Sequence, residues 1–305
     1  MRAMTMRRWG RLTALILIAG AQGAAAQTCR HVGEPGAGYA VCEATVGQDL
    51  RLWLTGPDGK PMGTFERLRD AVAAEGGTLV FAMNAGMYHP DRRPVGLYIE
   101  NRVEASGILT GASAGNFGMR PNGVFCVRAD GFAVIESRAF AKAPADCRYA
   151  TQSGPMLVIG GDLHPRFLPE SDSRHIRNGV GVTTDGQRAV FAISDAPVTF
   201  HEFGTFFRDV LGLPEALFLD GSISRLYSTD LGRDDFGFPM GPMVGLVAPQ
   251  GRRGAGAGIA RRSSSGTTEH GAQKRPQGQR MGRDRQACRR RVDDSREHCA
   301  AGLWS

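Results

Sequence analysis

The chain has 305 residues, of which 37 are Lys or Arg and 30 are Asp or Glu, so its formal net charge is +7. The positive excess is confined to the two ends: residues 1–26 carry +4 and residues 251–305 carry +8, whereas residues 27–250 carry −5. Because the part of the chain that can fold is mildly acidic, the charge does not indicate a nucleic-acid-binding protein, and we expect no nucleic-acid partner.

Residues 1–26 have the pattern of a secretory signal peptide. Four arginines precede an apolar run at residues 12–21, and Ala24-Ala25-Ala26 supplies the small residues that a signal peptidase accepts. The run is shorter than the roughly 20 apolar residues of a membrane-spanning helix. We therefore expect an exported protein, periplasmic or extracellular, that begins at Gln27 and keeps no transmembrane span after cleavage.

Residues 27–250 are long enough for one domain with a substantial core, and they contain four cysteines. These are Cys29, Cys42, Cys126 and Cys147. Disulfides persist in exported proteins, and four cysteines allow three pairings. Proximity in sequence favours Cys29 with Cys42 and Cys126 with Cys147, although spacing alone does not decide. No Cys-x-x-Cys spacing indicates a zinc site.

Strands dominate the predicted secondary structure of this domain. In chain order, the expected strands are residues 39–46, 49–55, 78–83, 95–101, 123–128, 132–136, 178–184, 188–194 and 216–219. Asp130-Gly131 and Asp185-Gly186 are typical hairpin turns, so the strands on either side of each are expected to pair.

Two helices interrupt the strands. Thr64 can cap the first, which is expected to run to Ala74 before Gly76-Gly77. Thr199 and Glu202 form a capping box at the start of the second. The apolar residues that this helix offers to the core are Phe203, Phe206, Phe207, Val210 and Leu211. The pattern predicts an α+β domain with a mostly antiparallel or mixed twisted sheet and a few packed helices.

Residues 251–305 differ in composition from the domain before them. They are rich in Gly, Arg, Ser and Gln and have almost no aliphatic residues. Such a segment cannot bury enough apolar surface to offset the entropy of ordering it, so we expect a disordered basic tail.

Five short segments combine glycine with polar side chains at expected strand ends. They are residues 84–88, 115–125, 152–157, 174–181 and 219–225. Small residues beside polar ones let a ligand approach the backbone closely. Each segment alone is consistent with an ordinary turn, but the five together predict a shared polar pocket.

These segments, in this order, resemble those of the phosphodiester glycosidase family. The resemblance covers about residues 75–247, is most specific at residues 115–125 and 152–158, and is closest to the secreted bacterial branch. It implies a hydrolase that cleaves a phosphodiester-linked glycoside at the sugar–phosphate bond, with a small-molecule or cell-envelope glycan as partner. Ser222-Ile223-Ser224 stands where the animal branch tends to carry further glycines, so the pocket is expected to differ in shape.

Hydrolysis at the anomeric carbon requires a carboxylate near the sugar and cations or amides around the departing phosphate. Asp220 is the candidate carboxylate, and Arg174 and Arg177 are the candidate phosphate fork. The candidate substrate-binding residues are Asn84, Arg120, Asn122, Gln152, Ser153, Gly154, Asn178 and Ser222. Without the resemblance, Asp220 is equally well explained as a turn residue, and the two arginines as a solvated pair at a strand start.

Other candidates have simpler explanations. The capping box accounts for Glu202, and Asp195 is the reserve acid. Gly111–Gly115 matches the letters of a serine-hydrolase elbow but does not lead into a helix, which leaves a hydrolase based on Ser113 or Ser153 as a rival hypothesis. We expect no metal and no cofactor, because His/Cys clusters, calcium loops, P-loops and dinucleotide fingerprints do not appear. The alternative function is a non-catalytic binder of cell-envelope carbohydrate.

Overall fold

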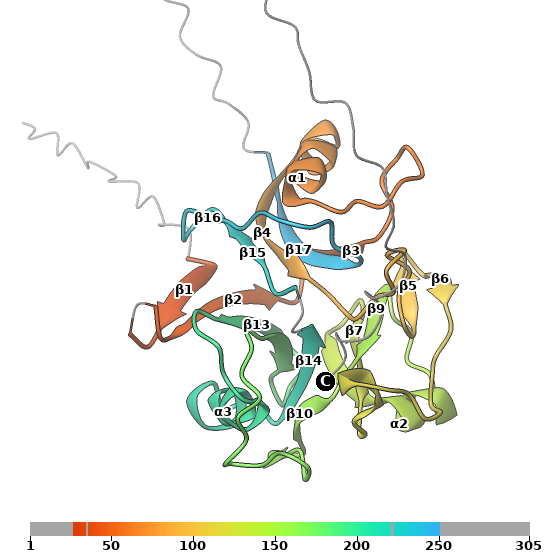
Figure 1. Cartoon of the computed structure of the whole chain (residues 1–305). Helices are drawn as coiled ribbons and strands as arrows, with labels where there is room; N and C mark the ends of the chain where they lie inside the picture. Colours follow the sequence, from red (N-terminus) through yellow and green to blue (C-terminus); the bar gives the residue numbers. More distant parts are fainter. Residues whose placement is uncertain (1–26, 35, 221–222, 251–305) are drawn as a thin grey trace, which may run out of the picture. The chain divides into compact units, whose positions relative to one another are not determined.

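The computed structural model describes residues 27–34, 36–220 and 223–250 (Figure 1). The chain divides into two compact units, Met1–Ala248 and Pro249–Ser305. The expected signal peptide, the expected tail and Ser222 lie outside the described residues. Within the described ranges no helix has both the length and the apolar character that crossing a membrane requires.

The described residues of the first unit form three sheets (Figure 1). In spatial order, the strands of the seven-stranded sheet are β1 (Cys29–Val32), β2 (Tyr39–Thr45), β13 (Arg188–Ser194), β12 (Asn178–Val182), β14 (Glu215–Asp220), β10 (Met156–Ile159) and β11 (Asp162–Leu163). Those of one five-stranded sheet are β16 (Arg233–Asp234), β15 (Leu226–Ser228), β4 (Gly77–Asn84), β17 (Met243–Pro249) and β3 (Asp49–Trp53). Those of the other are β6 (Val103–Ser106), β5 (Tyr98–Glu100), β9 (Tyr149–Ser153), β7 (Gly123–Val127) and β8 (Phe132–Glu136).

The helices are few and short, and each packs on a different sheet (Figure 1). α1 (Phe65–Ala74) packs on β4, α2 (Ser137–Lys142) on β7 and β8, and α3 (Phe200–Thr205) on β10 and β11. The predicted mixture of mostly antiparallel strands with a few helices is therefore correct at the level of class. The division of the strands into three sheets was not predicted.

Local pairing follows the sequence pattern, whereas long-range pairing does not. β7 pairs with β8 and β12 with β13 as antiparallel hairpins, as the two Asp-Gly turns predict. β2 and β3 follow each other in the chain but belong to different sheets, because β2 pairs with β13 and β3 pairs with β17. Turn residues determine the first kind of contact, and only packing of the whole domain determines the second.

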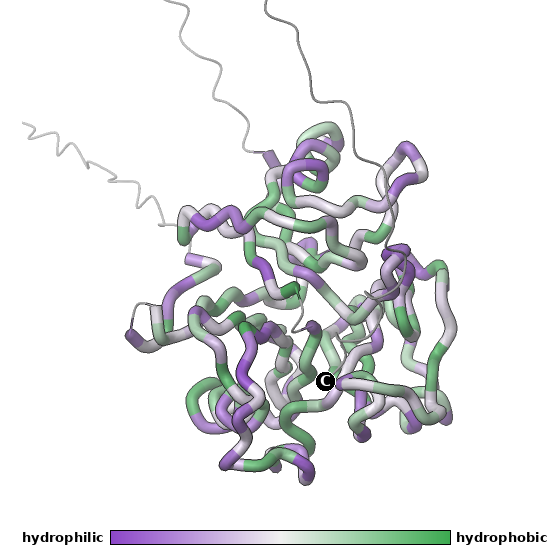
Figure 2. The backbone as a smooth tube through the Cα atoms, in the orientation of Figure 1, coloured by the Kyte–Doolittle hydropathy of each residue, from purple (hydrophilic) through white to green (hydrophobic). Residues whose placement is uncertain are grey.

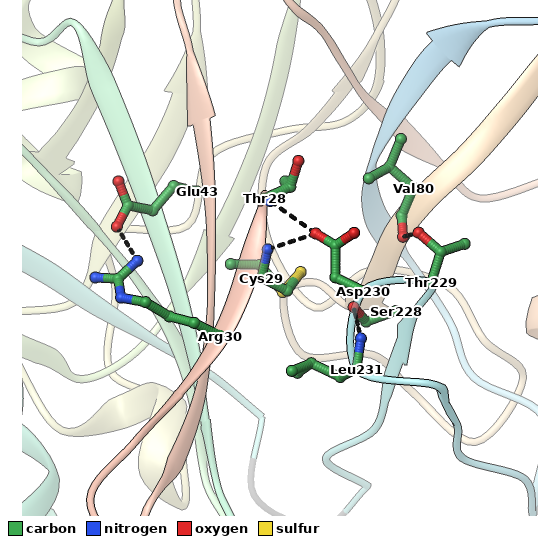
Figure 3. Close-up of a disulfide and its surroundings, with 10 residues drawn as sticks. Thr28, Cys29, Arg30, Glu43, Val80, Ser228, Thr229, Asp230 and Leu231 are labelled. Carbon is green, nitrogen blue, oxygen red and sulfur yellow. Dashed lines mark hydrogen bonds and ion pairs between the residues drawn. A yellow bond between two sulfur atoms is a disulfide. The ribbon is translucent and has the colours of Figure 1, made fainter. Parts of the chain in front are cut away.

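Two disulfides close the loops that sequence proximity favours, Cys29–Cys42 and Cys126–Cys147. Cys29 and Cys42 are also register partners between β1 and β2. The Asp230 carboxylate accepts hydrogen bonds from the backbone N–H groups of Thr28 (2.7 Å) and Cys29 (2.9 Å) (Figure 3). The start of β1 is therefore held by a disulfide to β2 and by hydrogen bonds to the Asp230 carboxylate, which follows β15.

The main core lies where the three sheets meet. Phe191 of β13 contacts Phe81 of β4, with ring centres 5.5 Å apart, and Phe125 of β7, with ring centres 5.6 Å apart. All three side chains are at most 1% exposed, and hydrophobic residues follow the converging strands in Figure 2. Burial of each ring stabilises the fold by about 1.5–3 kcal/mol, so these contacts hold the sheets in a defined arrangement.

The helix that begins at the Thr199 capping box buries only part of its predicted apolar face. Phe203, Phe206 and Phe207 are buried, but Val210 is 59% exposed, so its predicted place in the core is wrong. The helix changes at Phe206 to a π-helical turn, in which the Leu211 N–H donates to the Phe206 carbonyl. A π turn has more residues than an α turn, and this moves Val210 away from the buried face.

Candidate functional site

Asp220, the predicted catalytic carboxylate, is the last residue of β14. Five buried or half-buried residues precede it, and its own side chain is 8% exposed. Its register partner is Asn178 at the start of β12, whose side-chain Oδ1 accepts a hydrogen bond from the Asp220 N–H (3.0 Å). The Asn178 side chain therefore fixes the backbone of the residue that carries the carboxylate.

Asn178 is in turn paired with Asn84, the last residue of β4. The Asn84 Nδ2 donates to Asn178 Oδ1 (3.2 Å), and the Asn178 Nδ2 donates to the Asn84 carbonyl (2.8 Å). Both side chains are 0% exposed. The pair joins the seven-stranded sheet to the β4 sheet at the end of β14, and buried amides of this kind are costly to leave unpaired.

The chain after β14 returns to the same two asparagines. The Arg225 N–H donates to Asn84 Oδ1 (3.0 Å), and the Ser224 hydroxyl lies 2.7 Å from the Asp220 carbonyl oxygen. We call Asn84, Asn178, Asp220, Ser224 and Arg225 the asparagine junction. It brings together three residues predicted for the site, Asn84, Asn178 and Asp220, from segments far apart in the sequence.

Tyr88 shares the electrostatic environment of the junction. Burial raises its pKa to about 12, and the negative charge of Asp220 contributes to the rise, while Arg92 and Arg225 oppose it. Its hydroxyl is buried and has no hydrogen-bond partner among the described residues. A tyrosine with this pKa stays protonated at neutral pH, so the hydroxyl remains a hydrogen-bond donor and adds no second negative charge near Asp220.

A second group of predicted residues lies against the strand that carries Asp220. The Ser153 hydroxyl, at the end of β9, donates to the Leu219 carbonyl (2.7 Å). The next residue, Gly154, lies so close to Asn122 that an added Cβ would be 2.5 Å from the Asn122 Cβ. Asn122 is buried, and its Nδ2 donates to the Phe117 carbonyl (2.7 Å). Only glycine permits this approach of the chain after β9 to the residue before β7, and the Ser153 hydrogen bond joins their sheet to β14.

Gln152 is buried, and its amide is fully used inside the protein. Its Oε1 accepts from the N–H groups of Leu97 (3.0 Å) and Leu109 (3.0 Å). Its Nε2 donates to the Leu109 carbonyl (2.6 Å) and lies 2.8 Å from the Ser137 hydroxyl. The geometry gives this side chain a positioning role, because contact with a sugar would require one of these bonds to break.

The two arginines predicted as a phosphate fork have separate partners and do not converge on one acceptor. Arg174 is on the surface, and its two terminal nitrogens bind the Glu202 carboxylate at 2.8 and 2.9 Å. Glu202 also completes the Thr199 capping box, and the Thr199 backbone amide and Arg174 lower its pKa. Part of the charge of Arg174 is therefore neutralised on the surface by Glu202.

Arg177 is a buried cation. Its side chain is 1% exposed, its guanidinium carbon lies 3.6 Å from the ring centre of Phe200, and its Nε donates to the Val198 carbonyl (2.8 Å). Burial lowers its pKa to about 10, so it remains charged at neutral pH. The guanidinium carbon also lies 5.5 Å from the ring of Phe218, two residues before Asp220. Because its nitrogens are enclosed, its influence on a bound anion would be electrostatic.

Three further residues of the site received no role from the sequence: Ser224, Tyr88 and Arg225. They lie at the ends of the first and fifth polar segments, so the signal was their place in those segments. Arg120, which was predicted, is partly exposed and donates to the Thr110 carbonyl (3.3 Å). The reserve acid Asp195 faces Arg233 at 3.3 Å.

A metal centre or a cavity elsewhere in the fold would be an alternative location for the functional site. No group of three or more His, Cys, Asp or Glu residues in the described part of the chain is arranged to hold a metal ion. A cavity of about 400 Å³ is lined by residues of β3, β5 and β9, among them Trp53, Glu100 and Tyr149, and by no residue of the asparagine junction. We place the candidate site at the junction, because the predicted carboxylate Asp220 meets two other predicted polar residues there, Asn84 and Asn178.

Comparison with known proteins identifies the family. Residues 77–238 match the model of the phosphodiester glycosidase family. The uncharacterized protein YigE of Escherichia coli (strain K12) is 35% identical over 178 residues, which are 58% of this chain and 69% of YigE. The chain therefore belongs to the phosphodiester glycosidase family, and the resemblance stated from the sequence is confirmed.

A solved structure shows the same fold. It is the catalytic domain of zebrafish N-acetylglucosamine-1-phosphodiester alpha-N-acetylglucosaminidase, auto-inhibited by its pro-peptide. The match has a TM-score of 0.50 at 14% identity and covers 72% of this chain and 81% of that one. Tyr88 and every residue of the asparagine junction fall within the family match.

Proposed function

We propose that this chain is an exported hydrolase that cleaves a phosphodiester-linked glycoside at the sugar–phosphate bond. The observation that carries the proposal is the asparagine junction, which holds Asp220 beside Tyr88 and Arg225 within the family match. A carboxylate near a polarised anomeric carbon stabilises the oxocarbenium-like transition state of glycoside hydrolysis. A cation and a protonated hydroxyl stabilise the charge that develops on the departing phosphate.

The roles follow from charge and position. Asp220 lies next to the anomeric carbon, and Arg225 and the Tyr88 hydroxyl bind oxygens of the phosphate. Water adds its hydroxyl to the anomeric carbon, the bond between that carbon and the phosphate oxygen breaks, and the remaining proton goes to the phosphate. Asn122, Ser153 and Gly154 border the sugar and Arg120 borders the phosphate, which are the places expected from the sequence, and Ser222 remains a prediction.

The export part of the proposal is supported by the two disulfides, which persist in oxidising compartments. We propose that residues 1–26 are removed, that residues 27–250 form the catalytic domain and that residues 251–305 are a separate basic extension. The family match at residues 77–238 lies wholly inside the proposed catalytic domain.

The test is turnover by the purified mature protein, with UDP-N-acetylglucosamine and a p-nitrophenyl phosphodiester as substrates, with and without a chelator. Release of the free sugar supports the proposal, and release of nitrophenol alone would indicate attack at phosphorus instead. Saturable glycan binding without any product would favour the carbohydrate-binding alternative.

Asp220→Asn should lower kcat by about 10²- to 10⁴-fold and leave the thermal unfolding temperature nearly unchanged, because the backbone contacts of Asp220 are kept. Asp234→Asn is the matched control: its carboxylate is on the surface, paired with Arg69 at 3.2 Å, and its loss should leave turnover unchanged. A folded, fully active Asp220→Asn variant would show that another group supplies the carboxylate.

A further inference from the structure

The connection between β16 and β17 passes along the candidate site. Arg225 Nη1 donates to the Phe238 carbonyl (2.6 Å), and Gly237 lies directly against the Arg225 guanidinium. Gly237 has φ +146, a conformation that glycine adopts readily. Further along, Gly241 packs on the ring of Tyr88. We call residues 236–241 the site loop.

The site loop exposes two phenylalanines. Phe236 is 96% exposed and Phe238 is 76% exposed, and these are the highest values for large apolar side chains in the described part of the chain. The other exposed large apolar side chains among the described residues, Val103, Leu109, Leu168 and Val210, lie several residues apart from one another in the sequence. Leaving a phenylalanine side chain in water forgoes the free energy that its burial would release, so a pair of them beside a polar site indicates a surface that contacts a ligand.

The contacts made by the two ends of Arg225 indicate which part of the substrate the site loop borders. The Arg225 backbone is bound to Asn84 of the asparagine junction, and its guanidinium is bound to the site loop. In the proposed function Asp220 acts on the sugar and Arg225 binds the phosphate. The site loop therefore borders the group on the far side of the phosphate from the sugar.

We propose that Phe236 and Phe238 bind an aromatic ring in that group, so that the preferred substrates are aryl or nucleoside phosphodiesters of a sugar. This inference rests on the proposed function. Two phenyl rings offer no hydrogen bonds, and they discriminate a planar ring from a small alkyl group through stacking.

The experiment compares two substrates that differ only beyond the phosphate: the p-nitrophenyl and the methyl phosphodiesters of N-acetylglucosamine 1-phosphate. Phe236→Ala and Phe238→Ala should each lower kcat/KM for the aryl diester by roughly 3- to 10-fold. For the methyl diester, kcat/KM of each variant should stay within about twofold of the wild-type value, since a methyl group does not stack on the phenylalanines. Expressing each variant relative to the wild type cancels the different reactivities of the two diesters.

Leu168→Ala is the matched control, because Leu168 is an equally apolar side chain, 68% exposed, that lies outside the site loop. Leu168→Ala should leave kcat/KM, relative to the wild type, unchanged for both the aryl and the methyl diester. Equal losses for both diesters, or no loss for either, would overturn the inference. Loss of binding to phosphatidylglycerol vesicles with an unchanged aryl-to-methyl ratio would also overturn it, because the phenylalanines would then serve a membrane surface.

Failure of the proposed function can be distinguished from failure of the stacking inference. If the wild type hydrolyses neither diester, calorimetry of the same two compounds decides the inference alone. Tighter binding of the aryl diester that both phenylalanine variants lose would support the stacking surface. Equal affinities for the two diesters would refute it.

Discussion

Replacing Asn178 by alanine tests whether the asparagine junction holds the site together. Asn178 is fully buried, and its amide makes a long hydrogen bond with the Ser224 hydroxyl (3.4 Å) and three shorter ones: from the Asp220 N–H (3.0 Å), from the Asn84 Nδ2 (3.2 Å) and to the Asn84 carbonyl (2.8 Å). The three shorter bonds carry the argument. Asn178→Ala removes all three and leaves their partners buried without an acceptor or a donor. At about 1 kcal/mol for each lost bond, we expect a loss of about 3 kcal/mol in the free energy of unfolding.

For a domain of this size, a loss of about 3 kcal/mol corresponds to a fall of roughly 6–12 °C in Tm. Urea unfolding and thermal melting of the wild type and the variant measure it. Turnover should fall as well, by at least about tenfold at a temperature where the variant is fully folded, because Asp220 loses the partner that fixes its backbone.

Gln187→Ala is the matched control, since it removes an amide whose bonds to the carbonyls of Asp130 (3.3 Å) and Asp185 (3.4 Å) are on the surface. It should change the free energy of unfolding by less than about 0.5 kcal/mol. An Asn178→Ala variant as stable and active as Gln187→Ala would refute the argument that the junction positions the carboxylate.

The remaining predictions concern a titration and a disulfide. The pKa of Tyr88, about 12 in the folded protein, lies above the value of 10.0 that it takes in the unfolded chain. Its contribution to stability is therefore present below about pH 10 and is lost as the pH rises toward 12, by up to about 2 kcal/mol. Urea unfolding from pH 8 to 12 should show this loss for the wild type relative to Tyr88→Phe, and a constant difference across that range would contradict the shift. Replacing Cys126 and Cys147 by alanine opens a loop with a sequence separation of 21 and should lower the free energy of unfolding by about 3 kcal/mol. The difference should disappear when both proteins are fully reduced, since Cys29–Cys42 then opens in each, and a loss below about 1 kcal/mol in oxidised protein would show that the bridge contributes little.

The features that could be predicted from the sequence depend on neighbours along the chain. The Asp-Gly turns predict the β7–β8 and β12–β13 hairpins, and Thr64 and Thr199 predict the helix starts that the structure shows. Turns and caps are local contacts, so the residues that make them can be recognised by spacing alone. The five polar segments likewise identify the family, and three residues of the asparagine junction were among the predicted site residues.

Contacts between distant segments were decided only by the tertiary structure. Arg174 and Arg177 are three residues apart, yet one forms a surface ion pair with Glu202 and the other is buried over Phe200. Likewise, nothing in the sequence pairs Asn84 with Asn178 or places Tyr88 within range of Asp220. The energy of a polar side chain depends on its burial and on the charges around it, and both arise only when the three sheets pack together.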